Sequence, residues 1–102
     1  SLLFFLVSKK KIVILGGSGS IGSAIATELI NDGFDVTIIG RNYSTLEKIS
    51  KELGCSFVVS DVTKTEELKN IIQYANRNKI LLIGIVSKKE SSQVDARVIG
   101  EG

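Results

Sequence analysis

The sequence predicts an α/β fold with three layers: four parallel strands in the order 3-2-1-4, numbered along the chain, with helices on both faces. Seven segments of strand and helix character alternate along the 102 residues, which is typical of a parallel sheet with helical crossovers. Three of the four strand segments are almost continuously apolar, as expected for parallel strands buried on both faces. Right-handed crossovers then leave few possible strand orders.

The first half of the pattern predicts two strands around one helix. Residues 11–16 read as a buried strand, because four apolar residues follow one another from Ile12 to Leu15. Residues 20–31 have helical apolar spacing, and Asp32-Gly33 is a stop signal. Residues 35–39 form the second expected strand.

The second half repeats the pattern. We expect a helix over residues 44–53, with Ser44 as N-cap, Glu47 completing a capping box and Gly54 as the C-terminal stop. Further along, we expect a third strand, a third helix opening at Thr63 or Thr65 and a fourth apolar strand, over residues 56–60, 63–75 and 80–86.

Composition excludes several classes of function. Thirteen basic and eleven acidic residues give a net charge of +2, too small and too dispersed to predict a nucleic-acid partner. The chain has no histidine, which excludes Ser-His-Asp and Cys-His catalysis, and nothing replaces it as a metal-ligand cluster, so we expect no metal site. Cys55 is the single cysteine, which precludes an internal disulfide and suits the cytoplasm.

The chain begins with an apolar run from Leu2 to Val7. Six residues are too few for a bilayer, which needs about 20, so no membrane span is expected. We expect residues 1–10 to be an arm or an extra strand, residues 11–87 to be the main domain, and residues 88–102 to be a polar tail or a partial helix.

Glycines are concentrated where the first strand meets the first helix. The segment from Gly17 to Gly22 fits G-x-G-x-x-G, and Gly16, Gly19 and Gly22 also fit G-x-x-G-x-x-G. In a strand-to-helix turn, such glycines allow a tight bend, a close approach of backbone to a pyrophosphate, and close packing of helix on strand. The helix N-terminus attracts the anion, and the hydroxyls of Ser18 and Ser20 can add donors. The motif therefore predicts a dinucleotide site in a Rossmann-like half.

The end of the second strand favours NADP(H) over NAD(H). An NAD site places an acid about 20 residues after the glycines to bind the ribose 2′-hydroxyl, but here the chain reads Gly40-Arg41-Asn42. Arg41 supplies a charged, planar donor fork suited to a 2′-phosphate. Asn42 and Ser44 can assist the phosphate, or can simply turn the chain and cap the next helix.

Asp61 and Val62 follow the third strand, where an adenine ring would lie. The Asp61 carboxylate can accept a hydrogen bond from the adenine amino group while Val62 packs on the ring. Equally, Asp61 can be a loop residue that caps the following helix.

Three stretches, "LGGSGSIG", "IIGRN" and "SDVTKTEEL", together resemble the N-terminal half of the short-chain dehydrogenase/reductase family. The resemblance runs from Lys11 to Ile72. It implies that the glycine loop lines the pyrophosphate, that the 2′-phosphate meets the Arg41-Asn42 pair and that adenine meets the Asp61-Val62 pair. The loop residues implied in pyrophosphate binding are Gly16, Ser18, Gly19, Ile21 and Gly22.

The chain also departs from that family. Leu15 replaces the usual threonine, and "KILLIGIVS" lacks the family's Asn-Asn-Ala-Gly. The family's catalytic serine and Tyr-x-x-x-Lys, in which the lysine lowers the tyrosine pKa, lie beyond this chain. Tyr43 is followed four residues later by Glu47, and Tyr74 by Asn78. We therefore assign no catalytic residue.

Two classes of function follow from these residues. The chain is either the NADP(H)-binding part of an oxidoreductase whose substrate half lies elsewhere, or a stand-alone nucleotide-binding regulator resembling ligand-gating domains of potassium transport proteins. "IGIVSKKE" favours the second class, and Gly40-Arg41 argues against it. A fold that has lost its ligand is the third reading. The open edge of the fourth strand and the Leu2 to Val7 arm predict a homo-oligomer.

Overall fold

The computed structural model describes the backbone of residues 10–88 and 93–100, and side chains up to residue 85. Residues 1–9, 89–92 and 101–102 lie outside the description, so the expectation for the N-terminal arm falls there. The elements in chain order are β1 (Lys11–Leu15), α2 (Ser20–Asn31), β2 (Asp35–Gly40), α3 (Tyr43–Leu53), β3 (Ser56–Val59), α4 (Thr65–Arg77), β4 (Leu81–Lys88) and β5 (Gln93–Gly100).

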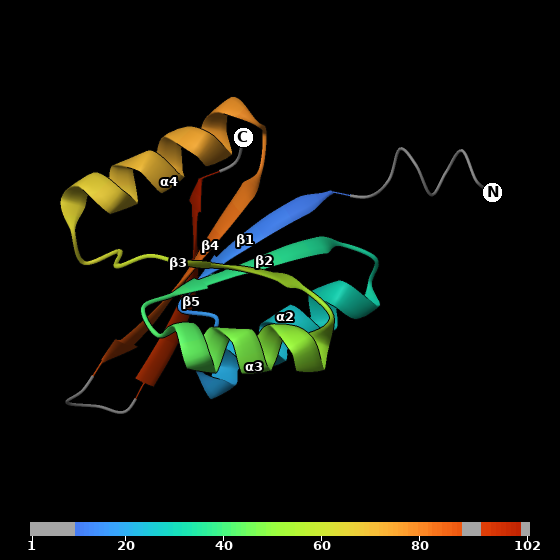
Figure 1. Cartoon of the computed structure of the whole chain (residues 1–102). Helices are drawn as coiled ribbons and strands as arrows, with labels where there is room; N and C mark the ends of the chain where they lie inside the picture. Colours follow the sequence, from blue (N-terminus) through green and yellow to red (C-terminus); the bar gives the residue numbers. More distant parts are fainter. Residues whose placement is uncertain (1–9, 89–92, 101–102) are drawn as a thin grey trace.

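One sheet organises the molecule, with strand order β3-β2-β1-β4-β5. The first four strands are mutually parallel, with Ile14 paired to Ile38 on one side and to Ile83 on the other. The predicted order 3-2-1-4 is therefore confirmed. Figure 1 shows α2 and α3 together against one face and α4 against the opposite face, which gives three layers.

Alternating residues of the central strands explain why their sequences are apolar throughout. Ile12 and Ile14 of β1 belong to the cluster beneath α2 and α3, which also holds Ile38 and Leu46. Val13 and Leu15 belong to the cluster on the α4 face. Successive side chains of a strand point to opposite faces, so in a strand covered on both faces every side chain is buried and apolar residues are favoured at every position.

The start of α3 differs from the expected capping box. The helix begins at Tyr43, and the side chain of Asn42 is the cap: its Oδ1 accepts a hydrogen bond from the Thr45 N–H at 3.0 Å. The assignment of Ser44 as N-cap is therefore wrong, because the helix begins one residue before Ser44, which lies within the first turn, and Asn42 supplies the capping oxygen. The Glu47 carboxylate instead accepts from the Tyr43 hydroxyl at 2.8 Å.

The other helix boundaries agree with the sequence more closely. Helix α2 spans the predicted residues 20–31. Helix α3 ends at Leu53, and Gly54 is its C-cap, with a left-handed φ of 73°. Of the two starts considered for α4, the later one, Thr65, is correct.

The C-terminal segment is neither a polar tail nor a partial helix. Residues 93–100 form β5, which pairs antiparallel with β4 from Lys88↔Gln93 to Leu82↔Gly100. The apolar residues Val94, Ala96 and Val98 recur at every second position, the period of a strand, among polar neighbours that mask the signal. The prediction that β4 is an open edge is also wrong, because β5 covers it. In the described sheet the edges are β3 and β5.

Candidate dinucleotide site

The turn between β1 and α2 begins with a glycine that the backbone conformation requires. Gly16 has a φ of +84°, in the left-handed region that residues with a Cβ rarely adopt. Its N–H donates to the carbonyl of Ile39 at 2.9 Å. This bond joins the loop to the end of β2, so the carboxyl ends of both strands meet at one place.

Two further glycines are required by close packing. A Cβ on Gly22 would lie 2.5 Å from the Gly16 carbonyl oxygen and 2.7 Å from the Gly17 Cα, and both of those atoms are backbone. A Cβ on Gly17 would lie 2.7 Å from the side chain of Ile38. The first turn of α2 therefore rests directly on the loop, as expected for the helix-packing glycine of a dinucleotide-binding turn.

Gly19 differs from these three because the fold does not demand a glycine there. Its φ of −84° and ψ of 169° are open to any residue. A Cβ at this position would find one neighbour within 4 Å, the Gly16 carbonyl oxygen at 3.9 Å. The space in front of Gly19 is thus free on the protein side, which leaves the backbone open to approach by a ligand.

Among the described residues, the first backbone N–H groups of α2 have no hydrogen-bond acceptor. Ser23 donates the first intrahelical bond, to the Gly19 carbonyl at 2.9 Å, so the preceding N–H groups of Ser20, Ile21 and Gly22 have no helical acceptor. The helix has neither a side-chain cap nor an acidic residue in its first turn. Among the three described helices this is unique, because Asn42 caps α3 and α4 carries two acidic residues in its first turn.

The remaining loop residues lie around this open helix end. Ser20 and Ile21 are exposed, Ile21 at 43%. Ser18 is half-buried, and its hydroxyl lies 3.2 Å from where a Cβ on Gly40 would stand. The seven loop residues predicted from the sequence therefore lie together at the start of α2, with Gly40 beside them.

The end of β2 presents the predicted arginine to solvent. Arg41 is exposed, and so is Asn42, whose Oδ1 is occupied as the α3 cap while its side-chain N–H₂ is left to donate. A side chain at Gly40 would press on Ser18 and on Leu46, 3.2 and 3.3 Å away. An acid in place of Gly40 would therefore crowd the glycine loop.

The end of β3 is held by hydrogen bonds within its own loop. The Asp61 carboxylate accepts from the hydroxyl and from the N–H of Thr63. The Thr63 hydroxyl, then its N–H, and to a lesser extent the guanidinium of Arg41, hold the pKa of Asp61 below its usual value. Asp61 thus forms a local turn and does not cap α4. Val62 is half-buried and packs on the α4-side cluster.

Sequence reasoning missed Glu67. Its Oε1 accepts from the Ser60 hydroxyl at 2.8 Å and from the Asp61 N–H at 2.9 Å. The Asp61 N–H first, and then the Ser60 hydroxyl, lower the pKa of Glu67. The available signal was an acidic residue in the first turn of α4, which is ordinarily a helix-dipole feature.

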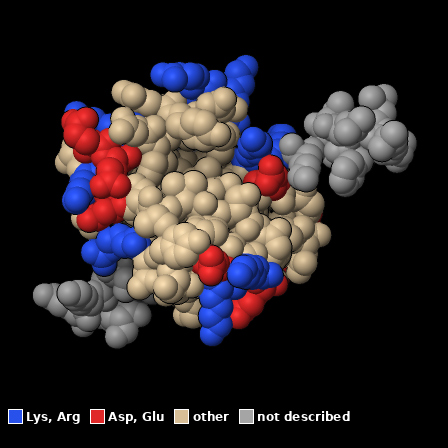
Figure 2. Space-filling model, viewed as in Figure 1, with Lys and Arg blue, Asp and Glu red and all other residues tan. Residues whose placement is uncertain are grey.

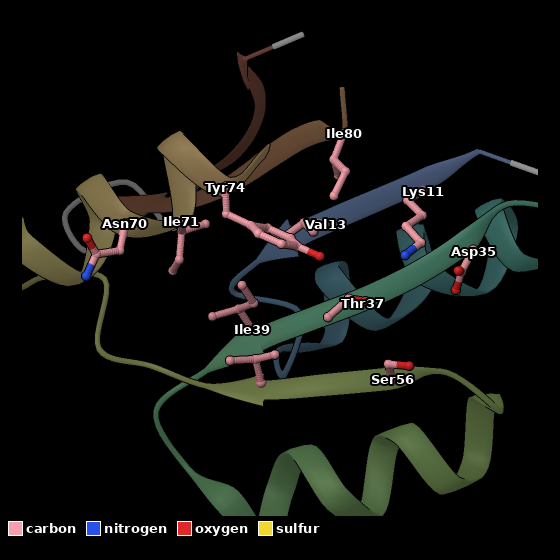
Figure 3. Close-up of a pocket in the computed structure, with 11 residues that line it drawn as sticks. Lys11, Val13, Asp35, Thr37, Ile39, Ser56, Asn70, Ile71, Tyr74 and Ile80 are labelled. Carbon is pink, nitrogen blue, oxygen red and sulfur yellow. The ribbon is translucent and has the colours of Figure 1, made fainter. Parts of the chain in front are cut away.

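A separate hollow lies on the α4 face of the sheet (Figure 3). It has a volume of about 420 Å³, and its apolar lining includes Val13, Ile39 and Tyr74. Lys11 and Asp35, the first residues of β1 and β2, also line it. The lining of this hollow contains none of the predicted cofactor residues, which follow the carboxyl ends of the strands, where open α/β sheets bind ligands.

The charged residues do not gather into a patch of one sign on the visible face. Figure 2 shows lysine, arginine, aspartate and glutamate around the margin of an uncharged area between α3 and α4. Within the described residues there is no group of three or more metal-ligating side chains. Likewise, no helix in the part of the chain that the structure describes is long and apolar enough to cross a membrane.

The fold and the glycine turn together define a Rossmann-like α/β domain with the layout of a dinucleotide-binding half. Residues 10–86 match the family model for short chain dehydrogenase, and the chain belongs to this family. It is 39% identical over 71 residues to an uncharacterized oxidoreductase of Staphylococcus aureus, covering 66% of this chain and 31% of that protein. A diacetyl reductase ((S)-acetoin forming) of Staphylococcus epidermidis is 38% identical over 71 residues, covering 65% and 28%.

Solved structures agree with this family. A short chain dehydrogenase from Bacillus anthracis superposes with a TM-score of 0.65 at 28% identity, over 76% of this chain and 34% of the other. A citronellol catabolism dehydrogenase of Pseudomonas aeruginosa gives 0.63 at 28% identity, over 82% and 40%. The chain thus spans about a third of the length of the curated relatives it matches. The family implies an NAD(P) cofactor, and the individual residue roles stay predictions.

Proposed function

We propose that this chain is the NADP(H)-binding region of a short-chain oxidoreductase. The cofactor, when bound, supplies the hydride chemistry, and the protein supplies position and electrostatics. In this proposal the glycine loop binds the pyrophosphate, the residues after β2 bind the 2′-phosphate, and the residues after β3 bind adenine. Family membership favours this role over a stand-alone regulator of transport.

The uncapped N-terminus of α2 carries the proposal. Three backbone N–H groups that have no acceptor among the described residues, at the positive end of a helix dipole, form a ready anion site. Gly19 supports it, because that glycine has no structural necessity and clears the approach to these donors. A purely structural turn would need Gly16, Gly17 and Gly22, but would be better served by serine or aspartate as the cap at residue 19.

The preference for NADP(H) over NAD(H) rests on Gly40, Arg41 and Asn42. No carboxylate follows β2 directly, so the acidic residue that would repel a 2′-phosphate in an NAD site has no counterpart at this position. The exposed Arg41 guanidinium can bind that phosphate with two parallel hydrogen bonds. The side-chain N–H₂ of Asn42 can also donate to that phosphate, while the Oδ1 of the same side chain stays bound to the Thr45 N–H as the α3 cap.

Substrate reduction needs a proton donor that these residues do not supply. Tyr43 donates its hydroxyl to Glu47, and the Glu47 carboxylate raises the pKa of Tyr43, the reverse of what a proton-donating tyrosine requires. We propose that the reaction centre comes from sequence outside these 102 residues, in a substrate half or in a second chain.

The test is titration calorimetry of the chain with NADPH and with NADH. Replacing Arg41 by alanine should weaken NADPH binding by about tenfold or more, because one charge-assisted hydrogen bond contributes roughly 1.5–3 kcal/mol. NADH binding should change less than about twofold, since it has no 2′-phosphate to lose. The matched control is Arg77→Ala, which removes an exposed arginine from the last turn of α4.

Two results would contradict the proposal in different ways. Equal losses for NADPH and NADH in Arg41→Ala would show that Arg41 does not read the phosphate. Failure of the unmodified chain to bind either dinucleotide would remove the cofactor role altogether.

A further inference from the structure

The end of β3 is fixed by a carboxylate from the helix that follows it. Glu67 Oε1 accepts two hydrogen bonds at once, from the Ser60 hydroxyl at 2.8 Å and from the Asp61 N–H at 2.9 Å. The N–H of Ser60 donates to the Gly40 carbonyl at 2.8 Å. Glu67 therefore holds the end of β3 at Ser60 and Asp61, and Ser60 in turn binds the end of β2 at Gly40, next to Arg41.

The hydrogen-bonding groups of Asp61 are then nearly all used. Its N–H is bound to Glu67, its carbonyl accepts from the Lys64 N–H at 3.1 Å, and its carboxylate Oδ1 accepts from Thr63. Within the described residues no donor reaches the other carboxylate oxygen, Oδ2. What Asp61 can offer a ligand is a hydrogen-bond acceptor and not its backbone donor.

We propose that Glu67 is a positioning residue that fixes the Asp61 turn so that Asp61 presents an acceptor alone, which selects a base bearing an amino group over one bearing a carbonyl. This inference rests on the proposed dinucleotide function and deepens it. Adenine carries an amino group at the relevant position, whereas hypoxanthine carries a carbonyl oxygen that the Asp61 carboxylate would repel. A polar group left unpaired in this way discriminates strongly between otherwise similar ligands.

The geometry separates Glu67 from an ordinary acidic residue of a helix start. Glu66, its neighbour in the same first turn, is exposed, and its side chain makes no hydrogen bond within the described residues. Glu67 is half-buried, and it bonds backward to the strand instead of capping α4. The lowered pKa of Glu67 agrees with a carboxylate that is held by two donors.

The experiment compares NADPH with its deaminated analogue, in which hypoxanthine replaces adenine, by titration calorimetry. The unmodified chain should prefer NADPH. In Glu67→Ala we expect NADPH binding to weaken about five- to tenfold, as for one lost positioning contact, with little loss for the analogue, so that the preference falls toward one. Glu67→Gln keeps an acceptor oxygen and should retain the preference, and Glu66→Ala should leave both affinities unchanged.

A general loss of structure would weaken both ligands alike and would overturn the positioning role. So would an unchanged preference in Glu67→Ala. The free chain offers an independent measurement: the amide resonance of Asp61 should follow the titration of the Glu67 carboxylate with pH, and should lose that response in Glu67→Ala. If the unmodified chain binds neither ligand, the proposed function fails and the base selection with it, whereas a silent Asp61 amide rejects the Glu67 contact itself.

Discussion

The β1–α2 turn and the β3–α4 turn both lead from the carboxyl end of a parallel strand into a helix, yet their polar groups differ in how they are hydrogen-bonded. After β1, the N–H groups at the start of α2 have no acceptor in the part of the chain that the structure describes, and the first turn of α2 has neither an acidic residue nor a side-chain cap. After β3, Glu67 and Thr63 bind the polar groups of Asp61. One turn is left open and the other is closed by its own side chains.

The difference separates what the fold needs from what a ligand needs. Helix N-termini are commonly capped by short polar side chains or carry acidic residues in their first turn. In this chain Asn42 caps α3, and α4 has Glu66 and Glu67 in its first turn. At α2 the chain places four glycines instead, three of which have a steric or conformational reason within the fold. The fourth, Gly19, has no such reason within the described residues, which supports the proposed role of this turn in binding a ligand.

The largest expected effect is on the glycine that the fold needs most. In Gly22→Ala the new methyl group would meet two backbone atoms at 2.5 and 2.7 Å, which cannot move without displacing the loop. We expect the free energy of unfolding in urea to fall by about 2 kcal/mol or more, although alanine favours a helix by about 1 kcal/mol over glycine.

Gly54→Ala is the matched control for Gly22→Ala. Gly54 has a left-handed φ of 73°, but no atom of the described residues lies within 4 Å of the position that a methyl group would take there. Only the backbone conformation is therefore penalised, by about 1–2 kcal/mol. A stability of Gly22→Ala equal to that of the unmodified chain would show that the loop and α2 are not packed as closely as the distances indicate.

The next effect should appear in binding and not in stability. Gly19→Asp places a favourable cap on α2 in a conformation that any residue can adopt, so stability should stay equal or rise by about 0.5–1 kcal/mol. The same carboxylate would occupy and repel the anion site, and dinucleotide affinity should fall at least about tenfold by calorimetry.

Gly19→Asn is the neutral control, since it has nearly the same shape and also caps helices. If charge repulsion at an anion site is the cause, asparagine should weaken binding less than aspartate does. Equal binding by the unmodified chain and Gly19→Asp would exclude the start of α2 as the pyrophosphate site, and the contrast between the two turns would then have no functional meaning.

The features that the sequence predicted well are those governed by local patterns or by general rules of chain topology. The run from Ile12 to Leu15 identified β1 because burial on both faces removes every polar position. The strand order followed from alternation and crossover handedness. The glycine turn was recognisable because its spacing and its place between strand and helix are both specific.

The features that were missed depend on longer-range pairing or on competition between neighbours. β5 was masked by polar residues, and only its pairing with β4 makes its alternation meaningful. Asn42 and Ser44 are both good caps, and spacing alone does not decide which one the backbone reaches. Glu67 has the appearance of a helix-dipole acid, and its bonds to Ser60 and Asp61 depend on how α4 turns back toward β3.

The smallest expected effect concerns the closed turn and its response to acid. The Thr63 hydroxyl is the first cause of the lowered pKa of Asp61, so Thr63→Val, which keeps the side-chain shape and the N–H, should raise that pKa toward its usual value. A carboxyl whose pKa is lower in the folded state stabilises the fold above its unfolded pKa, and this contribution is lost as the pH falls through the folded value. The stability difference between the unmodified chain and Thr63→Val should therefore be present near pH 7 and shrink below about pH 4.

Titration of the Asp61 carboxyl carbon by NMR measures the pKa, and urea unfolding at both pH values measures the stability. Thr65→Val serves as the control, because that exposed threonine makes no side-chain hydrogen bond within the described residues. An unchanged Asp61 pKa in Thr63→Val would mean that the Thr63 hydroxyl does not bind the Asp61 carboxylate. The turn after β3 would then have one hydrogen bond fewer, and it would differ less from the open turn after β1.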